Sequence, residues 1–162
     1  METAILGSVL SVVANSQLAS ALKASQYVYP VINAVHILGL ATLFGAILVL
    51  DLRLLGAFGS VSAQSLAAVL PSIAATGLGV ALTTGLLLFS VNPFDYAANP
   101  AFLTKILLVV TGAVHAIWVH TSSGWKALVG GSGRVGSGLR LSAAASLIIW
   151  TGAIFAGRFI AF

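Results

Sequence analysis

The sequence contains no cysteine, which excludes several classes of site. Disulfides, thiolate zinc sites, iron–sulfur clusters and cysteine nucleophiles all require that side chain. Charge is also scarce: only 6% of the 162 residues are charged, whereas an ordinary soluble domain has about a quarter. Seven basic residues against three acids give a net charge of +4, too little for the continuous basic surface that binds nucleic acid. Neither water as the main solvent nor nucleic acid as a partner fits this composition.

Hydrophobic residues make up 59% of the chain and gather in runs that approach the roughly 20 residues needed to cross a bilayer. We therefore expect an all-α protein, a single membrane domain over residues 1–162, built as a four-helix bundle embedded in the lipid bilayer. The predicted spans cover residues 31–50, 70–91, 101–121 and 141–160. Pro71 is expected in the first turn of the second span, where its missing N–H costs little.

The remaining segments are polar or rich in glycine. Residues 5–24 have apolar side chains at helical spacing interrupted by Ser, Asn and Gln, which predicts one amphipathic helix lying in the membrane interface. A fifth span is the alternative. Residues 54–64 and 92–100 are expected to be connecting loops, and the glycine-rich stretch 130–138 a flexible linker.

Small residues recur every fourth position and indicate where helix backbones approach one another, because lipid provides no hydrophobic drive for packing. These residues are Ala41 and Gly45 on the first span, Gly77, Ala81 and Gly85 on the second, and Ala153, Gly157 and Ala161 on the fourth. The same positions could instead join separate subunits.

Basic residues predict the orientation in the membrane. The loops between spans one and two and between three and four carry Arg53, Lys126, Arg134 and Arg140, whereas Lys23, Lys105 and Arg158 lie on the other side. The positive-inside rule then places both termini in the periplasm of a bacterial inner membrane.

Two histidines, His36 and His115, lie well inside the predicted spans, whereas His120 lies at the cytoplasmic end of the third. An ionisable group inside hydrocarbon is a candidate functional site. Neutral imidazole is a common haem ligand, so His36 and His115 are candidates to hold haem b. At about 1.5 Å per residue, however, their depths differ by roughly 13 Å, which disfavours a haem between them. The alternative is a hydrogen bond from each imidazole to a threonine such as Thr76, Thr83, Thr84 or Thr111.

A polar layer is predicted near the periplasmic face. Asn33 and His36 share one helix face, and Lys105 and Arg158 reach a similar depth on other spans. The layer could bind a quinone, a small anion, a haem propionate or, through His36, haem iron or copper. Alternatively, Lys105 and Arg158 extend to lipid phosphates without binding anything.

Asp51 is the only acid expected at the cytoplasmic side, where it should pair with Arg53, Arg140 or His120 as a structural pin. A proton-relay role is the alternative. The three acids, Glu2, Asp51 and Asp95, are predicted to lie apart, so paired-carboxylate or Ser/His/Asp catalysis is not expected.

Several runs resemble a family of small, functionally unassigned bacterial membrane proteins: Tyr29-Pro30, the His36-Ile37-Leu38-Gly39-Leu40 run, Asp51-Leu52-Arg53-Leu54-Leu55-Gly56, Asn99-Pro100-Ala101-Phe102, and Gly157-Arg158-Phe159-Ile160. The DLRLLG run after a histidine-bearing span is the most specific of these. His115 departs from the family pattern. The first span is more distantly similar to copper-resistance proteins of the D type and to cytochrome b561-like bundles, which implies copper handling or haem-based electron transfer.

Together these features predict a small membrane subunit of a redox or metal-handling system, not an enzyme by itself, that binds haem b or a quinone through His36. Copper is the weaker ligand, because Cys is absent and Met1 is the only methionine. The alternative is a structural or assembly subunit without a cofactor. Its partners would be lipid, other membrane subunits or further copies of itself.

Overall fold

The computed structural model describes residues 2–132 and 134–160, and they are almost entirely helical. The helices are α1 (Glu2–Ala14), α2 (Gln17–Ala24), α3 (Val28–Leu55), α4 (Ala63–Val91), α5 (Pro93–Ala98), α6 (Pro100–Thr121), α7 (Ser123–Ala127), the π-helical turn η1 (Leu128–Ser132) and α8 (Ser137–Phe159). Four of them, α3, α4, α6 and α8, are long and apolar enough to cross a membrane. The predicted four-helix bundle is confirmed.

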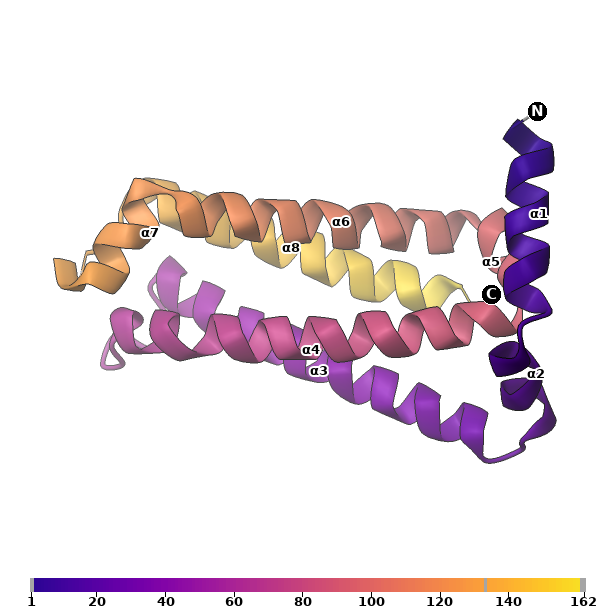
Figure 1. Ribbon diagram of the computed structural model, residues 1–162. Coiled ribbons are helices and arrows are strands. Elements are labelled where there is room, and N and C mark those ends of the chain that lie inside the picture. Colours follow the sequence, from indigo (N-terminus) through magenta and orange to yellow (C-terminus); the bar gives the residue numbers. More distant parts are fainter. Residues whose placement is uncertain (1, 133, 161–162) are drawn as a thin grey trace.

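The bundle consists of two antiparallel helix pairs. Helix α3 packs along α4, and α6 packs along α8, while contacts between α3 and α8 join the pairs. Figure 1 shows α4 and α6 in front and apart from each other, with α3 and α8 behind them. Over the described ranges the backbones of α4 and α6 do not approach each other closely. One side of the bundle is therefore more open than the others.

Glycines determine how closely α3 and α4 approach. A Cβ atom on Gly39 would lie 2.9 Å from the Ala81 backbone nitrogen, and one on Gly77 would lie 2.8 Å from the Gly39 carbonyl oxygen. Gly77 and Ala81, two of the small residues predicted to lie at helix contacts, therefore pack against α3 of the same chain. On α3 the contact uses Gly39 and not Gly45, beside which a Cβ would meet nothing within 4 Å. Ala161 lies outside the described residues.

The ends of the long helices follow from local sequence. Helix α3 ends at Gly56, whose φ of 116° is left-handed and suits glycine. Ser62 caps α4 by accepting a hydrogen bond from the Ser65 amide at 3.2 Å. Asn99 caps α6 by accepting one from the Ala101 amide at 2.9 Å, and Pro100 occupies the first helical position.

Three segments differ from the sequence prediction. Residues 5–24 do not form one helix: the chain breaks between α1 and α2, where Ser16 caps α2 by accepting from the Ala19 amide at 3.2 Å. Figure 1 shows α1 lying across one end of the bundle. The 92–100 loop contains helix α5. Pro71 lies inside α4 and not in its first turn, because α4 begins eight residues earlier, at Ala63.

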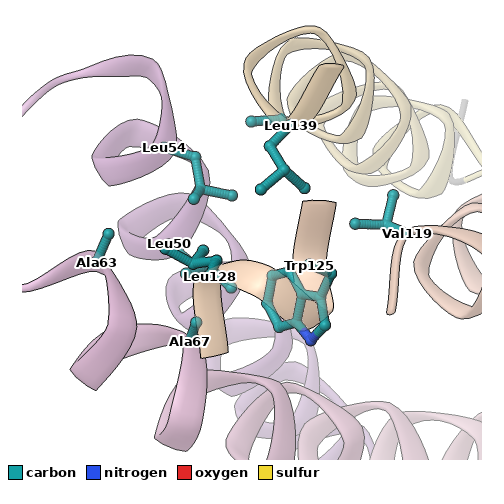
Figure 2. Close-up of a cluster of buried hydrophobic side chains, with 9 residues drawn as sticks. Leu50, Leu54, Ala63, Ala67, Val119, Trp125, Leu128 and Leu139 are labelled. Carbon is teal, nitrogen blue, oxygen red and sulfur yellow. The ribbon is translucent and has the colours of Figure 1, made fainter. Parts of the chain in front are cut away.

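The expected flexible linker at 130–138 begins inside η1, and Gly131, with a left-handed φ of 99°, interrupts the helical geometry there. The position of η1 is fixed by Leu128, which is fully buried. Figure 2 shows Leu128 beside Leu50 and Ala67, with Trp125 lying between these residues and Val119. This cluster closes the α7 end of the bundle, where both helix pairs meet.

Candidate functional site

His36 of α3 is held by a hydrogen bond to α4. Its Nδ1 lies 3.0 Å from the Thr84 Oγ1. The single hydroxyl proton of Thr84 is directed to the Val80 carbonyl oxygen at 2.6 Å, so Oγ1 acts as the acceptor and His36 Nδ1 as the donor. In this neutral tautomer the Nε2 atom keeps its lone pair and can accept a proton or bind a metal ion.

Gly85 makes room for the imidazole. A Cβ at this position would lie 3.2 Å from the His36 Cε1 atom, so a larger residue would push the ring away from Thr84. Thr84 is among the four threonines that the sequence offers as a partner, whereas the sequence pattern indicates Gly85 only as a packing residue. The hydrogen bond and the glycine together fix the orientation of the ring, as the surrounding hydrogen bonds do for metal-binding histidines.

Lys105 of α6 lies near this histidine. Its side chain is half-buried. Its side chain packs over Gly157 of α8, where a Cβ would lie 3.5 Å from the Lys105 Nζ. Of the predicted layer, His36 and Lys105 lie near each other, and Thr84 joins them as the partner of His36. Asn33 and Arg158 are both exposed.

Aromatic rings lie beside this layer at the same end of the bundle. Phe89 of α4 stacks on Phe102 of α6, with ring centroids 5.5 Å apart and planes at 14°. Tyr96 of α5 contacts both rings, at 6.1 Å and 5.3 Å between centroids. Burial raises the pKa of the Tyr96 phenol, and the neighbouring Tyr29 hydroxyl adds to the rise.

His115 is not brought to His36. It lines a cavity at the other end of the bundle, and its ring lies 6.1 Å from that of Trp118. The part of α3 that lines this cavity begins at Leu43, roughly 10 Å along the helix from His36 at about 1.5 Å per residue. A haem held between both imidazoles of one chain does not fit this arrangement. Within the described residues, no group of three or more His, Asp or Glu side chains lies together.

The cavity lies between the four long helices and measures about 300 Å³. Most of its lining is apolar, and Asp51 of α3 is the acid that lines it. Asp51 is only 6% exposed. Its Oδ2 has no hydrogen-bond partner in the described part of the chain, while the buried Ser146 side chain lies close to the carboxyl.

The expected ion pairs of Asp51 are not formed among the described residues. The Arg53 Nε donates to the Val61 carbonyl oxygen instead. His120 packs on Trp125, with ring centroids 4.4 Å apart, and Arg140 is exposed. The prediction that Asp51 holds α3 in place by pairing with Arg53, Arg140 or His120 is therefore wrong. The difference arises because α3 continues past residue 50 and carries Asp51 into the packed end of the bundle.

The sequence pattern did not indicate the cavity or the two tryptophans in its lining, Trp125 and Trp150. The one sequence feature that could have indicated the cavity is Asp51, which is followed by an apolar run with Arg53 as its only other charge. The same pattern is expected for an aspartate at the level of the lipid headgroups. Ser142 and Ser146 carried no signal, since serines are common on all these helices. No family model matches the chain, and neither a curated protein nor a solved structure does.

Proposed function

We propose that this chain is a small integral membrane subunit of a redox system, and that it binds the head group of a quinol beside His36. The observation that carries the proposal is the hydrogen bond from His36 Nδ1 to Thr84 Oγ1, which leaves Nε2 as an acceptor. A quinol presents a hydroxyl group to such an acceptor. In this proposal the chain binds the quinol for a partner subunit that oxidises it, and the chain does not oxidise the quinol by itself.

The neighbouring groups suit the same ligand. The Lys105 ammonium can donate to the second quinol oxygen and favours any negative charge that develops there. The rings of Phe89, Tyr96 and Phe102 provide an aromatic surface on which a flat ring stacks. A quinone is also soluble in lipid, so it can reach a site within a membrane bundle.

Haem b is the second candidate, because a free Nε2 on an oriented imidazole is equally the geometry of an axial ligand. In that case His36 would be the only ligand from this chain, and a partner subunit would supply the other. Copper remains weaker, since the soft sulfur ligands preferred by Cu(I) are missing around His36.

We also propose a bacterial inner membrane as the location, with the α7 end in the cytoplasm and both termini in the periplasm. Arg53, Lys126, Arg134 and Arg140 all lie in or next to the segments at the α7 end, which supports this orientation.

A structural or assembly subunit is the alternative function. It is favoured by Ala41 and Gly45 of α3, which are not used in packing within the chain: Ala41 is exposed, and a Cβ on Gly45 would meet nothing within 4 Å. Such a small-residue face lets the backbone of a partner helix approach. The alternative predicts that Ala41→Leu releases a co-purifying partner while leaving the chain folded.

Histidine ¹⁵N NMR of the full chain in nanodiscs tests the quinol proposal. Titration with decylubiquinol should shift the His36 Nε2 resonance, because that atom accepts the new hydrogen bond. His36→Gln should abolish the shifted signal, whereas His115→Gln, the matched control, should retain it. No shift at saturating quinol, or a shift confined to His115 or His120, would contradict the proposal.

An absorption spectrum of the same preparation, oxidised and then reduced, separates haem from quinol. The quinol proposal predicts no Soret band. A Soret band that is lost in His36→Ala would overturn it in favour of haem.

A further inference from the structure

The cavity at the α7 end is separate from the His36 layer and has the size of a small-molecule site. Its volume of about 300 Å³ lies at the lower end of the roughly 300–1,000 Å³ typical of such sites. The lining comes from all four long helices and from Trp125 of α7. It is mostly apolar, as expected for a ligand that partitions into lipid.

Asp51 makes this cavity unusual. A carboxylate that is 94% buried with an unpartnered oxygen is costly, because it has lost its water without gaining hydrogen bonds. Ser146 offers one hydroxyl beside it, which leaves the Oδ2 unsatisfied. The free-energy cost of burying this carboxylate is relieved if the carboxyl is protonated or if a cation occupies the cavity beside it.

Among the residues that the structure describes, no lysine or arginine side chain lines the cavity. The titratable groups that line the cavity with Asp51 are His115 and His120, both of α6, and α4 contributes none. Lys126 of α7 and Arg140 of α8 are exposed and do not line it. Arg53, on the same helix as Asp51, is directed to the Val61 carbonyl oxygen. An unpaired acid therefore faces a cavity large enough for an organic molecule.

The remaining lining favours an organic cation over a metal ion. Trp125 and Trp150 are both buried and both line the cavity, and indole rings attract ammonium groups through their negative faces. A metal ion would need several oxygen or nitrogen ligands together, and among the described residues no group of three or more His, Asp or Glu side chains could hold one.

A route from the lipid is present on the open side of the bundle. Helices α4 and α6 meet through Phe89 and Phe102 at the His36 end, but their backbones do not approach closely along the described chain. Beside the cavity, Ala75 of α4 and Ile117 of α6 line it and are also exposed. Ala74, Ala75 and Leu78 of α4 line the cavity, and so do Ala113, Ala116 and Ile117 of α6. These side chains are apolar, and most of them are small. A molecule dissolved in the bilayer can thus enter between the two helices.

We propose that the cavity beside Asp51 binds a lipophilic ammonium cation that enters from the lipid between α4 and α6, and that the cation and a proton compete for the Asp51 carboxyl. When the cation binds to the protonated form, the carboxyl O–H breaks, the proton leaves to water, and the carboxylate pairs with the cation. The exchange is charge-balanced and needs no further reactant.

Tryptophan fluorescence provides a local readout of binding. The chain has three tryptophans, and Trp118 is exposed and lies outside the lining, so Trp118→Phe leaves only the two cavity tryptophans as reporters. This variant in nanodiscs is titrated with benzyltrimethylammonium and, in parallel, with neopentylbenzene, which has the same shape without the charge. We expect the cation to quench the fluorescence with an affinity at least about tenfold above that of the neutral compound.

Two variants and a control define the role of the acid. Asp51→Asn keeps the shape and removes the charge, so it should lower the affinity for the cation by at least about tenfold and leave that for neopentylbenzene unchanged. Asp95→Asn, at an exposed acid near the other end of the bundle, should change neither. Ala75→Phe fills the entrance and should weaken binding of both compounds, which keeps the proposal testable if Asp51→Asn fails to fold.

The competition is tested by pH. Affinity for the cation should fall as pH is lowered, and binding in weakly buffered solution should release protons that an indicator dye detects. Absence of cation binding would overturn the proposal, and so would equal binding of the two compounds. Cation binding by Asp51→Asn at full affinity, or binding that neither depends on pH nor releases protons, would also contradict it.

Discussion

Gly77 of α4 lies directly against the backbone of Leu43 in α3: a Cβ atom on Gly77 would stand 2.5 Å from the Leu43 nitrogen. Real Cβ atoms do not come so close to backbone atoms, so any side chain at position 77 forces the two helices apart. This contact holds the α3 and α4 pair together, and it lies between the His36 layer and the cavity that begins at Leu43.

Gly77→Ala should therefore destabilise the bundle by about 1–3 kcal/mol, the usual cost of overpacking a tight contact. Gly79→Ala is the matched control, since it lies on the same helix where a Cβ would meet nothing within 4 Å. It should be neutral or stabilising by up to about 1 kcal/mol. Reversible unfolding in detergent, followed by circular dichroism, measures both. Equal effects of the two substitutions would contradict the close crossing.

Thr84→Val should leave the His36 Nδ1–H without its acceptor, at a cost of about 1–3 kcal/mol. The ring should also lose its fixed tautomer, which histidine ¹⁵N shifts report directly. Thr83→Val is the control, because the exposed Thr83 hydroxyl bonds only to the Gly79 carbonyl oxygen of its own helix. If the wild-type protein shows the proton on Nε2 instead of Nδ1, the account of this site is wrong.

Asp51→Leu should stabilise the ligand-free protein. The substitution removes a buried oxygen without a partner, and the neighbouring cavity accommodates the change in shape. The expected gain is about 1–3 kcal/mol, the cost of an unsatisfied buried polar group, and it should come with loss of cation binding. Unfolding midpoints of the two proteins in the same detergent provide the measurement. A clear loss of stability would mean that Asp51 has a partner that holds the fold together.

The orientation can be tested with single cysteines, because the chain contains none of its own. Ala98→Cys lies at the end of α5, and Ser60→Cys lies in the connector between α3 and α4; both positions are exposed. A maleimide that cannot cross the inner membrane should label the first variant and not the second in cells with a permeable outer membrane. The reverse pattern would place the α7 end in the periplasm.

The sequence predicted the parts of the fold that depend on local pattern. Runs of apolar residues located the four long helices, and the spacing of Gly77 and Ala81 indicated a helix contact that the structure contains. The hydrogen bond between His36 and Thr84 was among the alternatives, because an imidazole in hydrocarbon needs a partner.

The cavity could not be predicted, because it depends on which helix faces meet. The hydropathy of the sequence indicates that α4 and α6 are apolar, but it does not indicate how far apart the two helices lie. The partners of Asp51 were mispredicted for a related reason: α3 is longer than its apolar run, so the acid lies inside the packed end and not at the headgroup level. Trp125 of α7 lines the cavity beside Asp51, although the glycines that follow it in the chain indicated a linker.

Lipid must surround the four long helices for either site to act as proposed, and spin-label accessibility measures this most directly. Nitroxides attached to Val110→Cys and Ile148→Cys probe the middle of α6 and α8, at side chains that are 55% and 74% exposed. In bilayers both labels should collide readily with dissolved oxygen and scarcely with a water-soluble nickel chelate. Ready collision of both labels with the nickel chelate would contradict the membrane bundle.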